Sequence, residues 1–210
     1  MLKLAQVNEK GGSGKSTLSL NLAHALALDG ARVLVIDADP QGTATDWLSV
    51  RDEGSPAPFR VIGLPKPIIH KEIGELARGY DAVIIDAPPK NEDILRSAIA
   101  AASHVVVPVQ PSGADLWPTR RVIDTIGQAR VFDETKRAAY CLTRVIAGTV
   151  IGREFAAEAE TYGLPVLAPY TVQRVAYAEA MSAGLTVFEI DATGPAAVEI
   201  RAILAAIKDM

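Results

Sequence analysis

The chain has 210 residues, of which 49% are hydrophobic, and carries a formal net charge of −4. This length and hydrophobic content are typical of one globular domain with a sizeable core, so we expect residues 1–210 to form a single domain. The acidic balance excludes a globally basic nucleic-acid binder, and any contact with DNA must use a local patch. The single Cys141 excludes an internal disulfide and, among apolar neighbours, predicts a buried structural thiol.

No run of apolar residues approaches the about 18 that a membrane span requires. The first residues lead directly into a strand, without a charged and then apolar leader. We therefore expect a cytoplasmic protein that does not insert stably into a membrane.

A strand, a glycine-rich loop and a helix open the chain. Leu2–Val7 has the length of a strand, and apolar residues recur at helical spacing in Leu18–Leu26. Between them, glycines allow successive backbone N–H groups to converge on phosphate oxygens, and the helix N-terminus adds a partial positive charge. We expect nucleotide contacts from Gly11, Gly12, Ser13, Gly14, Lys15, Ser16 and Thr17. Lys15 would reach the β- and γ-phosphates, and the Ser16 hydroxyl would ligate Mg²⁺.

Short β-branched runs then alternate with longer amphipathic stretches, without an internal repeat or a linker. This alternation predicts an α/β fold, with a mostly parallel twisted sheet flanked by helices on both faces. We expect strands at 32–36, 60–63, 82–85, 105–109, 138–142 and 164–167. We expect helices from the loop to Asp29-Gly30 and at 44–53, 71–77, 93–102, 114–131, 152–162, 174–183 and 195–208.

Carboxylates follow two of these strands directly. Asp37 and Asp39 come after the strand at 32–36, and Asp86 follows the strand at 82–85. Ligands of open α/β sheets bind at the carboxyl ends of the strands. A carboxylate there, beside the phosphate loop, holds Mg²⁺ or one of its waters. The alternative is a structural role, in which Asp86 caps its strand and Asp37 forms a turn.

The glycine loop departs from the common pattern G-x-x-x-x-G-K-[ST], because Glu9 occupies the first glycine position and a second lysine, Lys10, lies inside the loop. The segment Lys10–Ser16 resembles the deviant Walker A box of the ParA/MinD family of P-loop ATPases. The resemblance covers nearly the full length of the chain. Further segments that resemble the family are Asp37–Gly42, the Walker B-like Asp86–Pro89, and Gln173–Ala180 followed by Gly184. The chain resembles the small ParA type, which lacks an N-terminal DNA-reading domain.

This resemblance implies an ATP-dependent homodimer that sandwiches ATP and Mg²⁺ between its subunits. Lys10 would reach the partner's nucleotide, where a cation in trans neutralises charge that develops during phosphoryl transfer. Lys15 and Asp39 complete the implied catalytic set, with Asp39 orienting the attacking water. Ser16, Asp37 and Asp86 are the implied metal-side residues.

The resemblance further implies a slow, partner-stimulated ATP hydrolase that segregates or positions a plasmid, a chromosome or a large cargo. A ParB-like or cargo-adaptor protein would be the activator, and the ATP state would bind DNA non-specifically on the nucleoid. Candidate DNA contacts are Arg120, Arg121, Arg130, Lys136, Arg137, Arg153 and Arg174, although acidic neighbours also fit a solvated face of mixed charge. Arg144 and Arg174 could instead line the adenine site or the dimer interface.

Two alternatives remain open at this point. A MinD-like ATPase that cycles on and off the membrane would need a basic amphipathic C-terminal tail. The stripe Val198, Ile200, Ile203, Leu204 and Ile207 carries few basic neighbours, so docking of the last helix on the domain is the simpler account. An iron–sulfur carrier is disfavoured, because a dimer with one cysteine per subunit offers two thiolates where clusters usually take four.

Overall fold

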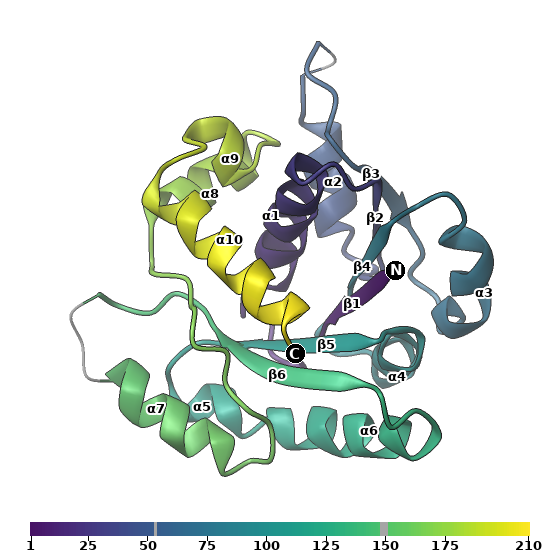
Figure 1. Cartoon of the computed structure of the whole chain (residues 1–210), viewed down its shortest axis with the longest axis vertical. Coiled ribbons are helices and arrows are strands. Elements are labelled where there is room, and N and C mark those ends of the chain that lie inside the picture. Colours follow the sequence, from purple (N-terminus) through teal and green to yellow (C-terminus); the bar gives the residue numbers. More distant parts are fainter. Residues whose placement is uncertain (53, 148–150) are drawn as a thin grey trace.

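In the computed structural model, which describes residues 1–52, 54–147 and 151–210, parallel strands form one twisted sheet (Figure 1). The strand order within this part of the chain is β3-β2-β4-β1-β5-β6. The strands are β1 (Leu2–Gln6), β2 (Val33–Asp37), β3 (Arg60–Gly63), β4 (Ala82–Asp86), β5 (His104–Val109) and β6 (Arg137–Leu142). The expected α/β fold with a parallel sheet is confirmed.

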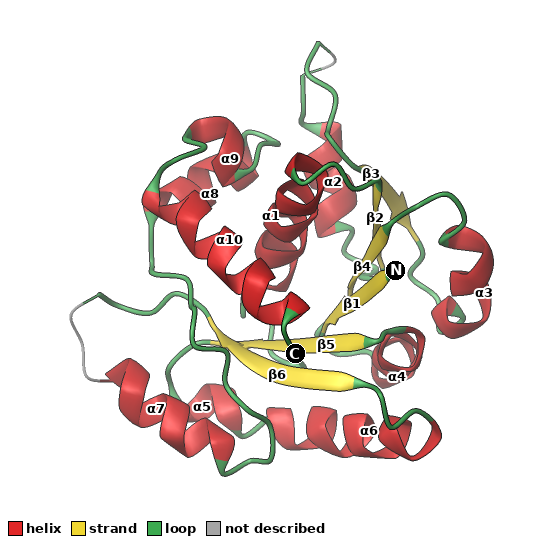
Figure 2. Cartoon of the chain, viewed as in Figure 1, coloured by secondary structure: helices red, strands yellow, loops and turns green. Residues whose placement is uncertain are grey.

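Helices cover both faces of the sheet (Figure 2). The helices are α1 (Lys15–Leu28), α2 (Thr43–Ser49), α3 (Ile69–Leu76), α4 (Glu92–Ala101), α5 (Gly113–Leu116), α6 (Thr119–Phe132), α7 (Ile151–Glu160), α8 (Val175–Ser182), α9 (Val187–Ile190) and α10 (Pro195–Lys208). One core layer joins the sheet to α3, α4, α6 and α7, and the other joins it to α1, α2 and α8 to α10. The central strands β2 and β4 are buried throughout, as expected for parallel strands covered on both sides.

The register of the central strands brings three strand ends to one level. Gln6 of β1 lies opposite Asp86 of β4, and Asp37 of β2 lies opposite Asp86 on the other side. The carboxyl ends of β1, β2 and β4 therefore meet at the same edge of the sheet, next to the loop that leads into α1.

Three of the expected elements differ in the structure. The helix expected at 44–53 ends at Ser49, and residue 53 lies outside the described residues. The helix expected at 114–131 is two helices, α5 and α6, separated at Trp117-Pro118. Proline has no N–H to continue the helix, and Pro118 takes the N-cap position of α6. The segment 164–167 is not a strand but a single bridge between Val166 and Tyr140, because Pro165 cannot donate to a ladder.

The segment between α8 and α10 is tied to the end of α2. The Arg51 guanidinium donates to the Gly184 carbonyl at 2.8 Å and forms an ion pair with Glu189. The Trp47 indole N–H donates to the Leu185 carbonyl at 2.9 Å. Gly184 has a φ of +66°, and a Cβ there would lie 2.9 Å from the Trp47 carbonyl oxygen and the Arg51 nitrogen. Both left-handed geometry and close backbone approach therefore require glycine at 184.

We predict that Gly184→Ala destabilises the fold by about 3 kcal/mol, the sum of left-handed strain of about 1–2 kcal/mol and overpacking of about 1–3 kcal/mol. Gly79→Ala is the matched control, because Gly79 has a φ of +83° and no atom within 4 Å of an added Cβ. The Gly79→Ala variant should be destabilised only by the left-handed strain, about 1–2 kcal/mol. Urea unfolding followed by circular dichroism measures both losses, and equal losses would contradict the clash at Gly184.

Candidate nucleotide-binding site

The loop between β1 and α1 has the backbone geometry of a phosphate cradle. Gly12 and Gly14 adopt left-handed conformations with φ of +76° and +93°, and Gly14 is the N-cap of α1. A Cβ on Gly14 would make only ordinary contacts with Thr143 at 3.6–3.7 Å, so its conformation, not space, requires glycine. The first turn of α1 contains no acidic residue, so its N–H groups face no competing carboxylate there.

Hydrogen bonds between the loop that follows β1 and the ends of β5 and β6 hold this cradle in place. The Asn8 amide donates to the Pro108 carbonyl at 2.7 Å, and the Gln110 amide donates to the Gly12 carbonyl at 2.8 Å. The Thr143 hydroxyl donates to the Ser13 carbonyl at 2.9 Å. Sequence reasoning missed these residues, because their partners lie about a hundred positions away. The cradle is therefore set by the sheet rather than by the loop alone.

Lys15 lies inside the cradle. Lys15 is 7% exposed, and its ammonium donates a hydrogen bond to the Lys10 carbonyl at 3.1 Å. Burial lowers the pKa of Lys15, whereas the charges of Asp86 and Asp39 act in the opposite direction. The Ser13 hydroxyl is buried nearby without a hydrogen-bond partner among the described residues. A buried cation and a free hydroxyl beside open N–H groups form a site that suits an anionic ligand.

Asp86 is the most strongly perturbed acid of the site. Burial raises its pKa to about 7, although a hydrogen bond from Ser16 favours the charged form, and the nearby charge of Asp37 raises the pKa further. Its Oδ2 has no hydrogen-bond partner among the described residues. The structure thus brings Ser16 and Asp86 together and leaves one carboxylate oxygen of Asp86 without a hydrogen-bond partner among the described residues.

Asp37 and Asp39 differ in how their carboxylates are used. Asp37 accepts hydrogen bonds from the Asp39 nitrogen at 3.1 Å and from the Thr45 nitrogen and hydroxyl at 2.9 and 3.0 Å. These bonds shape the start of α2, as the turn-forming alternative predicts. Asp39 is half-buried and accepts one bond, from the Gln41 nitrogen at 2.9 Å. Asp39 therefore keeps more free acceptor capacity toward a ligand than Asp37 does.

The residues fit a magnesium ion that arrives with a nucleotide. Within the described part of the chain, no three His, Cys, Asp or Glu residues gather into a metal cage. Mg²⁺ commonly takes one or two protein ligands and completes its octahedron with phosphates and water. The Ser16 hydroxyl and the free oxygen of Asp86 match that donor set.

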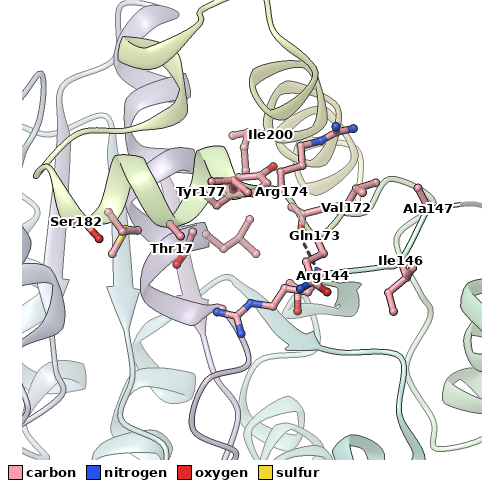
Figure 3. Close-up of a pocket in the computed structure, with 17 residues that line it drawn as sticks. Thr17, Arg144, Ile146, Ala147, Val172, Gln173, Arg174, Tyr177, Ser182 and Ile200 are labelled. Atoms are coloured by element: carbon pink, nitrogen blue, oxygen red, sulfur yellow. Dashed lines mark hydrogen bonds between the residues drawn. The ribbon is translucent and has the colours of Figure 1, made fainter.

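A cavity of about 940 Å³ extends from Gly14 and Thr17 toward α8 (Figure 3). Arg144 and Arg174 both line it, but their side chains point in different directions in Figure 3. Arg174 donates to Glu199 of α10 at 2.8 Å, so its charge is already paired. Arg144 is exposed and has a φ of +53°, a strained conformation for a residue other than glycine that often marks functional sites.

Lys10 contacts its own chain. Its ammonium forms an ion pair with Asp115 of α5, a residue that sequence reasoning did not select. The Lys10 side chain is 38% exposed, whereas the Asp115 side chain is 3% exposed. No sequence signal linked the two residues, because they meet only after β5 is placed beside β1.

The candidate DNA contacts fall into different environments. Lys136 was a wrong choice, because it is buried and donates to the Ala102 carbonyl. Arg130 is half-buried and donates to the Lys136 carbonyl at 3.1 Å. The exposed candidates are Arg120, Arg121 and Arg137. The Arg153 side chain lies outside the described residues.

Cys141 is buried, and its burial raises the pKa of the thiol to about 12. A thiol in this environment is a poor nucleophile and a poor metal ligand, because both roles need the thiolate. The expectation of a structural cysteine is confirmed.

We predict that Asp86→Asn raises the melting temperature of the nucleotide-free protein more at pH 8 than at pH 5. The pKa of Asp86 rises from 3.8 to about 7 on folding, so stability falls as the pH rises through that window. At pH 5 the acid is protonated in the folded protein but mostly ionised in the unfolded chain, so only the smaller part of the penalty that acts at pH 8 remains. One pKa unit corresponds to about 1.4 kcal/mol, and 1 kcal/mol shifts the melting temperature of such a domain by about 2–4 °C.

The control is Asp81→Asn, at the opposite end of β4. Asp81 is fully exposed, and hydrogen bonds from Arg32 lower its pKa, so its removal should give no gain at pH 8. Differential scanning calorimetry at both pH values measures the effect. A gain of equal size at pH 5 and pH 8 would contradict the buried charge.

Comparison with known proteins places this site in a family. The CobQ/CobB/MinD/ParA nucleotide binding domain matches residues 4–187. Maintenance of carboxysome distribution protein A of Halothiobacillus neapolitanus is 31% identical over 205 residues, covering 96% of this chain and 94% of that protein. Chromosome-partitioning ATPase Soj of Thermus thermophilus is 32% identical over 226 residues, covering 93% and 90%. A putative plasmid partition protein of Borrelia burgdorferi bound to AMPPNP shares the fold, with a TM-score of 0.80, 17% identity and coverage of 100% and 99%. This chain therefore belongs to the ParA/MinD family of nucleotide-binding domains.

Proposed function

We propose that this protein is a positioning ATPase that sandwiches ATP between two subunits, binds DNA non-specifically in that state, and hydrolyses ATP slowly until a partner stimulates it. The observation that carries the proposal is the pair of lysines on one phosphate loop. Lys15 is buried in the cradle of its own chain, whereas Lys10 is partly exposed on the same loop. Lys15 can therefore bind the phosphates of its own subunit's nucleotide, and Lys10 can contact the nucleotide of a second subunit.

The remaining site residues take roles that follow from their positions. Lys15 and the N–H groups of residues 11–17 bind the phosphates, and the cavity beside Arg144 takes the base. Ser16 and Asp86 hold Mg²⁺, which neutralises charge on the terminal phosphates when it is bound. Asp39 orients the attacking water, because its carboxylate retains free acceptor capacity. Asp37 accepts the hydrogen bonds that hold the start of α2, and its second proposed role is to lie beside the Mg²⁺ ion.

DNA binding is proposed to use exposed arginines at the start of α6. Arg120 and Arg121 are exposed there, and the Arg120 guanidinium lies 5.4 Å from the centroid of the Tyr162 ring. A two-fold dimer doubles this modest patch, and non-specific affinity rests on phosphate contacts. Binding of the ATP state to DNA would place the protein on the nucleoid.

The names of the relatives support a positioning role without selecting the cargo. One relative is named for carboxysome distribution and the other for chromosome partitioning. Both names describe the placement of a large object in a cell. A ParB-like protein or another cargo adaptor would then be the activator, and the cargo would be a plasmid, a chromosome or a large protein body.

The membrane-cycling alternative has less support. It requires a free amphipathic tail, but Ile200, Ile203, Leu204 and Ile207 of α10 are buried in the core layer that contains α1. The described helices include none that is long and apolar enough to span a membrane. Docking of the last helix on the domain, as expected from its sequence, is confirmed.

We predict that Lys10→Ala retains ATP binding but forms no ATP-dependent dimer and loses hydrolysis, because the cation offered to the partner is removed. Size-exclusion chromatography with light scattering, with AMPPNP and Mg²⁺, measures the dimer. Lys71→Ala, which removes an exposed lysine from α3, is the control and should behave like the parent protein. If Lys10→Ala dimerises like the parent, the cross-subunit role is wrong.

We predict that DNA binding requires ATP, ignores sequence and weakens with salt. Arg121→Glu should weaken binding to every duplex about equally without affecting the dimer. Each phosphate contact contributes about 0.9 to the slope of log affinity against log salt, so loss of one contact per subunit lowers the slope of a dimer by about 1.8. Arg60→Glu, at the start of β3 on the opposite edge of the sheet, is the control. Fluorescence anisotropy at several salt concentrations measures the slopes, and equal effects of both variants would exclude a patch on α6.

A further inference from the structure

Asp115 is a buried carboxylate whose cation comes from the phosphate loop. It lies in α5, between β5 and α6, and pairs with the Lys10 ammonium of the same chain. The Asp115 Oδ1 that faces Lys10 is buried and accepts no hydrogen bond from the described residues, so the ion pair with Lys10 is the interaction that stabilises its charge. A buried charge without a partner is unfavourable, so Asp115 favours conformations in which Lys10 stays beside it.

Asp115 is the fixed member of this pair. Its nitrogen donates to the Ser112 carbonyl at 2.8 Å, and the next residue, Leu116, is fully buried. The Thr119 hydroxyl bonds the Leu116 carbonyl at 2.6 Å and the Tyr140 hydroxyl at 2.8 Å, which ties α5 to β6. Lys10, by contrast, is partly exposed and has a flexible four-carbon stem. Separation of the pair therefore requires Lys10 to move, not Asp115.

The same lysine is connected to the nucleotide site through its backbone. The Lys15 ammonium donates to the Lys10 carbonyl at 3.1 Å, and the Lys10 nitrogen donates to the Asn8 side chain at 2.9 Å. A phosphate in the cradle would compete with the Lys10 carbonyl for the Lys15 ammonium. Nucleotide binding would thus release one of the contacts that hold Lys10 in its present position.

We propose that Asp115 is an autoinhibitory counter-ion, which retains Lys10 within its own subunit until nucleotide binds and a partner subunit offers a competing set of phosphates. This inference rests on the proposed function, in which Lys10 acts across the dimer. It makes dimerisation a competition between two anions for one cation: the Asp115 carboxylate in cis and the nucleotide phosphates in trans. Removal of the cis anion shifts the population toward the dimer-competent conformation.

The test is the AMPPNP-dependent dimerisation of Asp115→Asn, measured on the full chain by light scattering over a range of protein concentrations. Asparagine keeps the shape of the side chain and removes its charge. An ion pair worth about 1 kcal/mol corresponds to a factor of about five, and a dimer releases two such pairs. We therefore expect Asp115→Asn to dimerise about 25-fold more tightly than the parent and still to require nucleotide.

Three further variants make the result specific. Asp124→Asn, an exposed residue on α6, makes the same charge change away from Lys10 and should leave dimerisation unchanged. Lys10→Ala/Asp115→Asn should not dimerise, because the gain acts through Lys10. Asp115→Ser, which is smaller and also neutral, should reproduce the gain and replaces asparagine if that variant does not fold, as judged by circular dichroism.

The outcomes separate this inference from the function on which it rests. If the parent dimerises through Lys10 but Asp115→Asn dimerises equally or more weakly, the counter-ion inference is overturned and the proposed function stands. Weaker dimerisation would mean that Asp115 orients Lys10 toward the partner instead of restraining it. If neither the parent nor Asp115→Asn dimerises with AMPPNP, both proposals are wrong. A parent that stays monomeric while Asp115→Asn dimerises through Lys10 supports both.

Discussion

Buried charges of opposite sign, Lys15 and Asp86, are concentrated at the carboxyl edge of the sheet. Lys15 and Asp86 are both buried, and burial lowers the pKa of the first and raises the pKa of the second to about 7. Each group therefore carries its charge less readily than in water. In the proposed function, a nucleotide and its metal would supply the opposite charges that this arrangement lacks.

The fold can hold such a site because both faces of the sheet are closed by apolar layers. β1 lies between β4 and β5, and its carboxyl end meets those of its neighbours in register. The phosphate loop that follows is fastened by Asn8, Gln110 and Thr143 to the ends of β5 and β6. The position of the loop is thus a consequence of strand order, and the helices on both faces make that order stable.

The two lysines of the loop lie in different electrostatic environments. Lys15 is committed to the interior of its own subunit, while Lys10 sits at the boundary between a buried carboxylate and the exterior. A single flexible side chain with two alternative anionic partners is the simplest form of a two-state element. If Lys10 acts across a dimer as proposed, such an element would link the occupancy of one site to the assembly of two subunits without a large change in the backbone.

The local features of this protein can be predicted from its residues. The alternation of strands and helices, the glycine loop, and the carboxylates after β2 and β4 follow from residue periodicity and turn chemistry, which act over a few positions. The last helix was located at its observed bounds, Pro195–Lys208, from a first-turn proline and an apolar stripe. The helix expected at 114–131 is interrupted, because Pro118 has no N–H to continue α5 and takes the N-cap position of α6.

The partners of the polar residues depend instead on how distant elements pack together. The burial of Lys136, the pairing of Arg174 with Glu199 and the pairing of Lys10 with Asp115 join residues from different elements. Their charges look alike in the sequence, as exposed cations and anions. Whether each one is buried, paired or free depends on the strand order β3-β2-β4-β1-β5-β6, which sets the neighbours of every loop at the sheet edge. Periodicity cannot encode this order, because it reports on the faces of single elements and not on the contacts between distant ones.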